Sequence, residues 1–383
     1  ATLVFISSLI FLNCIAMKAS AANCGDTNSD GTTETACVCG DTVIGASGYT
    51  YQLTGDLGPC AGNGLTIGSA STTIDGNNYS IVGSNAKNSY GIYNNAIDNI
   101  TVENVTTTDF YNGVYLSGSA NNCTIKNVNA TSNVYSGIYL AGTSPSGNSL
   151  TNNTANSNYI GINLESASNT LAGNSMSGNT MANIYTDPLN STIDTSNTVE
   201  GKPVYYLYGT AANSYYSGQV YDGTVGDIGM FWCVNCKNVT VKNATLSANN
   251  YYGVLFSNTV TSTIDNVVSN SNYYGGIYIQ GGSYGNTITN NTVKYNNNQG
   301  GIYFNNSPNN TVSGNTVKDN PGYGIYFTTS ANNNTLTNNV ISGNSKGNIR
   351  AVTTALINSI DTSNTVEGKP VYYLYGTAAN SYY

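Results

Sequence analysis

The sequence contains no histidine and very little charge. Its 383 residues include 11 Lys and Arg and 19 Asp and Glu, so that only 8% of side chains are charged, against about 25% in ordinary globular domains. The net charge of −8 leaves no basic stripe for phosphate groups, which excludes a nucleic-acid partner. Without histidine, the chain also lacks the side chain that most often serves as a general acid or base and as a metal ligand.

Long apolar runs are missing too, except at the N-terminus. The apolar stretch "TLVFISSLIFLNCIA" is followed by small residues, with Ala19 and Ala21 placed as in an A-x-A cleavage site. The run is short for a membrane span, so residues 1–21 are predicted to be a secretory signal peptide, with a membrane anchor as the alternative. Because no initiator Met or basic start precedes it, we expect the sequence to begin inside the signal. The mature chain is expected to be extracellular or on the cell surface, or periplasmic in a cell with two membranes.

Cysteine usage fits export. Four cysteines crowd the first mature segment, and in an exported chain they predict disulfides rather than a metal site. Three pairings are possible and the sequence does not choose among them, but any of them would staple an N-terminal cap over residues 22–65. These cysteines are Cys24, Cys37, Cys39 and Cys60. Cys233 and Cys236 form a C-x-x-C in a β-rich run, which indicates a local disulfide or two buried thiols, and the isolated Cys123 is predicted to be buried.

A short phrase of the type G-I-Y-L recurs along the chain with one interruption, at a period of about 22–25 residues. Between its copies falls a second phrase, such as "NTITNNT". Each phrase reads as a short strand with period-two alternation, punctuated by Gly and Asn at corners. Short strands at a fixed period without helical periodicity predict an all-β solenoid. We expect a right-handed parallel β-helix with coils of about 22–25 residues.

The first and third residues after each Gly are predicted to face the interior of the coils. They are Ile92, Val114, Leu116, Ile138, Leu140, Ile277, Ile279, Ile302, Phe304, Ile325 and Phe327. Asn residues at equivalent corners of successive coils are expected to stack into ladders whose amides bond to one another.

One segment of the chain occurs twice without change. Ile193–Tyr216 and Ile360–Tyr383 are identical, and their starting points lie about seven coils apart at this period. This predicts a tandem array with a first block over 66–192, a linking coil over 193–225 and a second block over 226–359. Positions 360–383 would then begin another linking segment, in a chain that lacks its C-terminus. The linking coil exceeds one period by roughly 16 residues, which predicts a protruding Tyr-rich loop.

Tyrosine is the most abundant aromatic residue, with 32 copies. The second residue after each Gly should point outward, which predicts an exterior column of Tyr93, Tyr115, Tyr139, Tyr185, Tyr278, Tyr303 and Tyr326. The expected protruding loop adds Tyr205, Tyr206 and Tyr208, beside Lys202. Such amphipathic rings suit sugars and protein partners. The alternative is that stacked tyrosines only stabilise a β surface through cross-strand pairs.

A catalytic site is not predicted. Hydrolysis of a glycosidic bond requires carboxylates that converge on that bond, and the acidic residues here rarely share a position in the coil. Asp222 and Asp227 are the closest pair near aromatic residues. No metal site and no cofactor are predicted either.

The phrases "NTVEGKPVYYL" and "CVNCKNVTVKN", together with coils such as "NNTITNNT", resemble the NosD-type family of β-helix repeats. The resemblance covers roughly residues 60–383. It implies a right-handed parallel β-helix related to carbohydrate-binding and sugar-hydrolase β-helices, and the family name implies a role with copper. This sequence departs from that role, because it has no His and its four Met are scattered, whereas soft copper sites require clustered Cys, Met or imidazole.

These observations favour a secreted or cell-surface β-helix without catalytic activity, which binds polysaccharide or a surface glycoprotein through its tyrosines. Self-association through the ends of the β-helix or the tyrosine column is also expected to be possible. Two alternatives stay open: a polysaccharide lyase, hydrolase or epimerase of the β-helix type, and a periplasmic copper-delivery protein.

Overall fold

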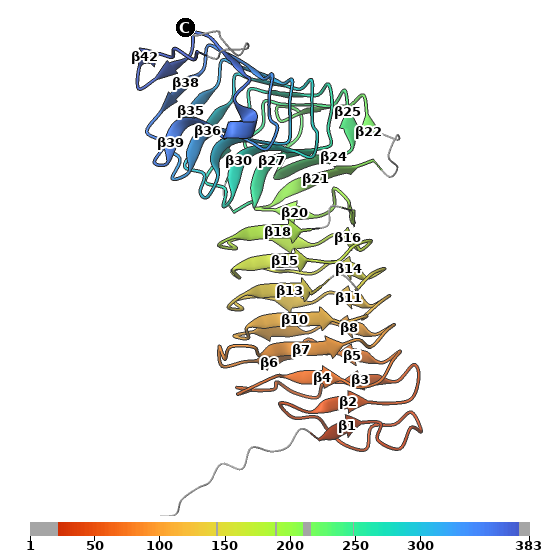
Figure 1. The fold of residues 1–383 in the computed structure, drawn as a ribbon. Coiled ribbons are helices and arrows are strands. Elements are labelled where there is room, and N and C mark those ends of the chain that lie inside the picture. Colours follow the sequence, from red (N-terminus) through yellow and green to blue (C-terminus); the bar gives the residue numbers. More distant parts are fainter. Residues whose placement is uncertain (1–21, 143–144, 188–189, 210–215, 248, 375–383) are drawn as a thin grey trace, which may run out of the picture.

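The computed structural model describes residues 22–374, apart from 143–144, 188–189, 210–215 and 248, so the predicted signal peptide lies outside the described residues. The described chain folds into two stacks of short β-strands that point in different directions (Figure 1). We call residues 22–199 rod 1, residues 202–370 rod 2, and their junction the elbow. Within the described ranges, no helix is long and apolar enough to cross a membrane.

Rod 1 has three faces, each a stack of strands in which successive coils contribute successive strands. Neighbouring strands are parallel and one coil apart. The first face contains β1 (Asn23–Gly25), β2 (Thr42–Ile44), β4 (Leu65–Ile67), β7 (Tyr90–Asn95), β10 (Asn112–Ser117), β13 (Ser136–Leu140), β15 (Ile160–Leu164) and β18 (Ala182–Thr186). The second contains β3 (Thr50–Gln52), β5 (Thr73–Asp75), β8 (Thr101–Glu103), β11 (Thr124–Lys126), β14 (Ser149–Thr151), β16 (Thr170–Ala172) and β19 (Thr192–Ile193). The third contains β6 (Ser80–Val82), β9 (Thr106–Thr108), β12 (Asn129–Ala130), β17 (Ser175–Met176) and β20 (Thr198–Val199).

Rod 2 repeats this plan. Its first face contains β21 (Lys202–Tyr208), β24 (Met230–Val234), β27 (Tyr252–Ser257), β30 (Gly275–Gln280), β33 (Gly300–Asn305), β36 (Tyr323–Thr328) and β39 (Gly347–Ala351). The second contains β23 (Val220–Asp222), β26 (Thr240–Lys242), β28 (Thr263–Asp265), β31 (Thr287–Thr289), β34 (Thr311–Ser313), β37 (Thr335–Thr337) and β40 (Ser359–Ile360). β22 (Tyr216–Ser217) and β25 (Cys236–Lys237) pair in a separate two-stranded sheet. The third contains β29 (Val268–Asn270), β32 (Thr292–Lys294), β35 (Thr316–Lys318), β38 (Val340–Ser342), β41 (Thr365–Val366) and β42 (Lys369–Pro370). A single 3-10 turn, η1 (Thr353–Ala355), interrupts the strands of the described chain.

The interior of each rod is a column of aliphatic and Phe side chains. The predicted inward residues are all buried, for example Ile277 and Ile279 on β30 and Phe304 on β33. Full burial of one such side chain contributes roughly 1.5–3 kcal/mol, and no coil can bury its apolar side without the next. The predicted parallel β-helix is therefore confirmed.

Buried asparagines form the predicted ladders. In rod 2 the Asn291 side chain donates to Asn315, Asn315 donates to Asn339, and Asn339 donates to Asn364, at 2.8–2.9 Å. Rod 1 has an equivalent ladder that ends at Asn197. Because each amide is satisfied by the next coil, the ladders favour coils of matching length and register.

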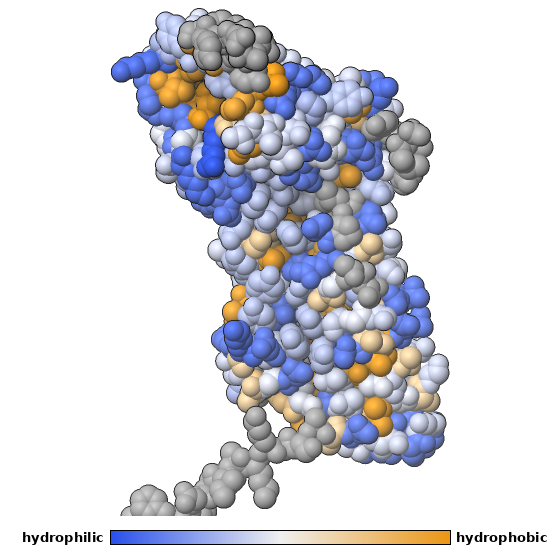
Figure 2. Space-filling view, viewed as in Figure 1, coloured by the Kyte–Doolittle hydropathy of each residue, from blue (hydrophilic) through white to orange (hydrophobic). Residues whose placement is uncertain are grey.

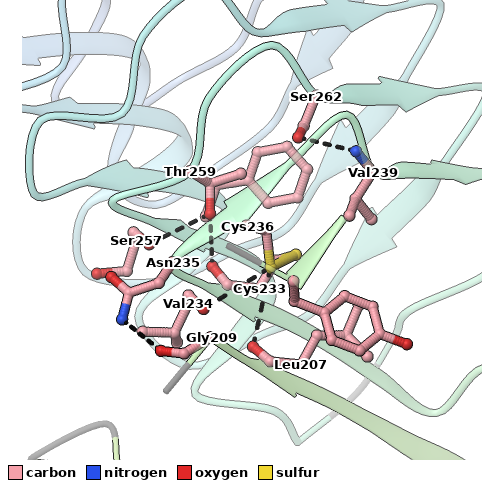
Figure 3. Close-up of a disulfide and its surroundings, with 12 residues drawn as sticks. Leu207, Gly209, Cys233, Val234, Asn235, Cys236, Val239, Ser257, Thr259 and Ser262 are labelled. Carbon is pink, nitrogen blue, oxygen red and sulfur yellow. Dashed lines mark hydrogen bonds between the residues drawn. A yellow bond between two sulfur atoms is a disulfide. The ribbon is translucent and has the colours of Figure 1, made fainter. Parts of the chain in front are cut away.

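Disulfides connect the predicted cysteines. The N-terminal pairs are Cys24–Cys37 and Cys39–Cys60. The third, Cys233–Cys236, is buried in the coil directly after the elbow, and the Cys236 sulfur lies 3.9 Å from the carbonyl oxygen of Leu207 on β21 (Figure 3). Cys123 is buried as a free thiol, as predicted.

The repeated segment makes the elbow. Its first part adds β19 and β20 to the last coil of rod 1, and a tight hairpin at Glu200 and Gly201 then reverses the chain into β21, the first strand of rod 2. Both turn residues have positive φ, 50° and 75°, as a two-residue hairpin turn requires. Residues 202–208, which were expected to belong to the protruding Tyr-rich loop, form strand β21 instead, so this part of the prediction is wrong. Residues 210–215 of the same expected loop lie outside the described residues. Part of the extra length beyond one period forms the hairpin that turns the chain. The length of a coil does not distinguish such a hairpin from a protruding loop.

The side of rod 2 covers the end of rod 1. Along β21 and β24, Tyr205, Leu207 and Phe231 face the interior of rod 2. The alternate residues Val204, Tyr206 and Trp232 instead join the core cluster of rod 1. Each of these strands is thus apolar on both sides, because one side fills rod 2 and the other seals rod 1.

Candidate functional site

Aromatic side chains follow the outer side of the first face of both rods. In rod 1, Tyr93, Tyr115 and Tyr139 are in register on consecutive strands, as predicted. In rod 2 the register runs from Tyr206 through Trp232 and Leu255 to the remaining tyrosines and a terminal cation. That part of the column is Tyr278, Tyr303, Tyr326 and Arg350.

Several of these side chains are not available to a ligand, which corrects the prediction of a wholly exterior column. Tyr206, Tyr278 and Tyr303 are only 7%, 5% and 8% exposed. Their neighbours cover them: the Tyr278 ring stacks on Tyr252 at 4.4 Å and on Tyr303 at 4.7 Å. Outward from a coil is therefore not the same as exposed, because rings from adjacent coils close over one another.

The remaining predicted binding residues are partly exposed. Tyr115, Tyr139 and Tyr326 are half-buried members of the column. Lys202, Tyr205 and Tyr208 are half-buried on β21, so they belong to the elbow rather than to a separate loop.

Further tyrosines, which stand one to three positions before the recurring Gly of the coil phrase, complete the surface. Ring contacts lead without a break from Tyr93 in rod 1 to Tyr326 in rod 2, and we call this set the aromatic ribbon. Its members are Tyr93, Tyr115, Tyr139, Tyr135, Tyr159, Tyr273, Tyr251, Tyr252, Tyr278, Tyr303 and Tyr326.

The ribbon crosses from one rod to the other at the inner corner of the elbow. There the hydroxyls of Tyr159 in rod 1 and Tyr273 in rod 2 are 2.9 Å apart, and the rings of Tyr185 and Tyr251 meet edge to face at 4.8 Å. Both contacts join residues that are several coils apart in the sequence, so only the bend of the chain brings them together.

A pocket of about 260 Å³ opens beside these contacts, and we call it the elbow pocket. Tyr185, Thr186 and Asp187 line it from the end of β18 in rod 1. Tyr251, Tyr252, Tyr274 and Gln280 line it from rod 2. The surface of the pocket is mostly polar: besides four tyrosine rings with their hydroxyls it carries one carboxylate, one amide and the Thr186 hydroxyl, so that hydrogen-bonding groups converge on it.

Burial keeps the tyrosine hydroxyls of this corner protonated. Desolvation, together with repulsion from neighbouring tyrosines and Asp187, raises the pKa of Tyr251 well above its ordinary value. The hydrogen bond with Tyr273 raises the pKa of Tyr159 to about 12. The corner therefore presents neutral hydroxyl groups as donors and acceptors at any physiological pH.

One group of carboxylates in the described chain is close enough to hold a cation. Single oxygens of Asp26, Asp30 and Glu34 lie within 4.8 Å of one another. Asp26 is buried, and its oxygens already accept hydrogen bonds from the backbone amides of Asp30, Gly31 and Ala46. These hydrogen bonds hold the loop that follows β1, and they give the carboxylate a structural role.

Asp222 and Asp227, the acidic pair closest to aromatic residues in the sequence, do not line a common pocket: Asp222 borders a space of about 430 Å³ with Tyr205 and Tyr221, and the lining of that space does not include Asp227. Asp222 is paired with Lys242 at 3.2 Å and accepts hydrogen bonds from Thr224 and Asn243. These contacts, the Asn243 bond foremost, hold the pKa of its carboxyl below the ordinary value. This is the state of a structural anion rather than of a general acid.

Family comparisons agree with this architecture. Residues 36–224 match the family described as periplasmic copper-binding protein (NosD), and residues 229–382 match the family described as right handed beta helix region. The chain is a β-helix repeat protein. Its NosD-like part comprises most of rod 1 and the elbow. No curated protein matches.

Several solved structures are similar to this chain at low identity. The mannuronan C-5 epimerase AlgE6 A-module of Azotobacter vinelandii is 16% identical, with a TM-score of 0.32, over 90% of this chain and 87% of that one. The periplasmic alginate epimerase AlgG is 14% identical, with a TM-score of 0.31, over 79% and 77%. The catalytic unit of a GH87 α-1,3-glucanase from Streptomyces thermodiastaticus is 11% identical, with a TM-score of 0.32, over 88% and 65%.

Proposed function

We propose that this chain is an exported β-helix protein that binds polysaccharide at the elbow, in the elbow pocket and along the partly exposed edge of the aromatic ribbon, without catalysing a reaction. The observation that carries the proposal is the elbow pocket itself, where tyrosines from two rods converge with Asp187 and Gln280. Flat rings offer stacking surface to the apolar faces of a sugar, and the neighbouring polar groups offer partners to its hydroxyls.

The geometry also favours a chain-like ligand over a compact one. The pocket is smaller than the roughly 300–1,000 Å³ of typical ligand sites, so it has room for a single sugar ring. Half-buried rings such as Tyr139 and Tyr326 continue the same surface along both rods. Further sugar rings of the same polymer would lie along them.

The test is binding of the mature protein to a glycan array, followed by Tyr274→Ala on any ligand found. Tyr274 lines the pocket and stacks on Tyr251 at 5.0 Å, and loss of such an anchor should weaken binding about tenfold. Tyr274→Phe keeps the ring and should bind within about twofold of the natural protein. Tyr284→Ala is the matched control, since Tyr284 is exposed and makes no ring contact among the described residues.

Equal binding by the Tyr274→Ala and Tyr284→Ala proteins would place recognition away from the elbow. Release of new reducing ends or of unsaturated sugars from the bound polymer would contradict the non-catalytic part of the proposal. Such products would instead support the polysaccharide-active alternative.

A further inference from the structure

One carboxylate lines the elbow pocket, and a second follows the equivalent strand of the adjacent coil. Glu165 directly follows β15 and Asp187 directly follows β18, and the preceding residues Leu164 and Thr186 are in register. Parallel neighbours in a sheet are about 4.8 Å apart. The two side chains therefore leave adjacent coils of rod 1 at the same position.

Both carboxylates are coupled to the tyrosines of the ribbon. Glu165 accepts from the Gly142 amide at 3.2 Å, and its hydrogen bond and negative charge add to burial in raising the pKa of the Tyr139 hydroxyl. Asp187 lines the pocket, and its charge adds to burial in raising the pKa of Tyr185 and Tyr251. The negative charge in this part of the molecule thus comes from two carboxylates, Glu165 and Asp187.

Within the described residues, no Lys or Arg forms an ion pair with Glu165 or Asp187. The residues that line the pocket include no Lys or Arg. The two ion pairs found in the described ranges, Lys126–Glu103 and Lys242–Asp222, lie elsewhere. The cation of the tyrosine column, Arg350, stacks over Tyr323 and Tyr326 near the far end of rod 2.

We infer that the elbow pocket selects a sugar that carries a protonated amine, as in a deacetylated amino-sugar polymer, and disfavours uronic acids. The inference rests on the proposed function and adds the charge of the ligand to it. An ammonium group on the sugar would supply the cation that the chain does not, while a uronate would bring a third negative charge to the corner. One unit charge at about 4 Å in a partly hydrated site changes affinity by about fivefold or more.

Three hexasaccharides of matched length separate the possibilities: one of glucosamine, one of N-acetylglucosamine and one of uronic acid. Isothermal titration of the mature protein at low salt should give the order amine, neutral, uronate, with at least about a fivefold step between the first two. The step should shrink at high salt, because screening at ~1 M ionic strength acts over about 3 Å.

Two variants assign the effect to the named carboxylates. In Asp187→Asn and Glu165→Gln the preference for amine over neutral sugar should fall toward onefold, because affinity for the amine hexamer should fall more than affinity for the neutral one. Asp319→Asn is the matched control: it removes one carboxylate after β35, in another face of rod 2, at a positive-φ turn position that Asn accepts. Circular dichroism verifies that each variant is folded.

The outcomes of these experiments distinguish a failure of the charge selection from a failure of glycan binding at the elbow. Equal binding of the amine and neutral hexamers, or tightest binding of the uronate, overturns the selection by charge but leaves glycan binding at the elbow in place. If none of the hexamers binds and the glycan array is also empty, the proposed function fails and the inference fails with it.

Discussion

The two copies of the repeated segment have one sequence and two surroundings. In the first copy Leu207 is 7% exposed and packs in the core of rod 2, whereas the equivalent Leu374 is 69% exposed. Tyr205 is half-buried, whereas its equivalent Tyr372 is 77% exposed. The segment therefore does not bury these side chains by itself. The coils that follow the first copy bury them.

The hollows beside the two copies differ in the same way. Beside the first, residues 191–193 and Tyr206 line a space of about 270 Å³ that Leu207, Tyr208 and Tyr216 also border. Beside the second, the equivalent residues 358–360 and Tyr373 line a space of about 500 Å³. Apolar surface gathers over this end of rod 2 in Figure 2. Leu356 and Ile357, in the segment before β40, are exposed. The space is therefore smaller where a following rod covers the end of the rod before it.

What stays the same is the hairpin. Glu367 and Gly368 repeat the positive φ angles of Glu200 and Gly201. The amide of Val371 donates to Asn364, as that of Val204 does to Asn197, at 2.9 Å in both copies. The turn is local and is made by its own residues, whereas the burial is supplied from elsewhere.

Replacing the equivalent leucines should give the largest difference between the copies. Leu207→Ala removes a buried side chain from the core of rod 2 and should lower the free energy of unfolding of rod 2 by about 2–5 kcal/mol. Leu374→Ala removes an exposed side chain and should change it by less than about 0.5 kcal/mol. Urea denaturation followed by circular dichroism measures both, and similar losses in the two variants would show that Leu374 is buried in solution.

Replacing the hairpin glycines should affect the copies equally. A Cβ at Gly201 or Gly368 meets no atom within 4 Å, so the cost arises only from the left-handed backbone and should be about 1–2 kcal/mol in each. Amide hydrogen exchange at Val204 in Gly201→Ala, and at Val371 in Gly368→Ala, reports this cost locally. Gly226→Ala is the control, because Gly226 has neither a positive φ nor a close neighbour. Unequal acceleration at Val204 and Val371 would mean that the turn depends on the next rod.

The smallest effect is expected from acid. The Glu367 carboxylate accepts hydrogen bonds from the Gly343 amide at 2.8 Å and from Asn348 at 3.0 Å, and these lower its pKa below the ordinary 4.5. A carboxyl whose pKa is lowered by folding stabilises the folded state above its ordinary pKa, and this contribution is lost as the pH falls through the lowered pKa. The Gly343 amide resonance should therefore titrate with a midpoint below 4.5. A midpoint at or above that value, or no titration, would show that the bond does not form.

The repetitive part of this structure could be predicted from the sequence. The strand phrases, the inward residues such as Ile277 and the Asn ladder that ends at Asn364 depend on near neighbours one coil away, and the period makes those neighbours explicit. The register of Tyr115 and Tyr139 follows for the same reason. The disulfide pairings could not be predicted, because four cysteines in one segment allow three solutions.

The elbow could not be predicted from the sequence for a different reason. Contacts such as Tyr159 with Tyr273 join residues that belong to different rods, and no period relates them. The turn with positive φ consists of only two residues, Glu200 and Gly201, which is too short a signal to recognise in the sequence. The extra length of the linking coil is equally consistent with a protruding loop and with a bend of the chain. Asp187 likewise could not be recognised as a pocket residue, because the other side of the pocket is formed by residues of rod 2.

The hairpin also has a consequence for avidity. The two copies of the repeated segment start about seven coils apart, which is about 34 Å of rod at about 4.8 Å per coil. In any chain that repeats this unit, one inner corner would therefore recur in every unit. Sites that are individually weak but joined at a fixed spacing bind a long chain far more tightly than any one of them, because each later contact is intramolecular. The affinity of such a protein for a long polymer would then depend on the number of units that it contains, without any change in the side chains of each site.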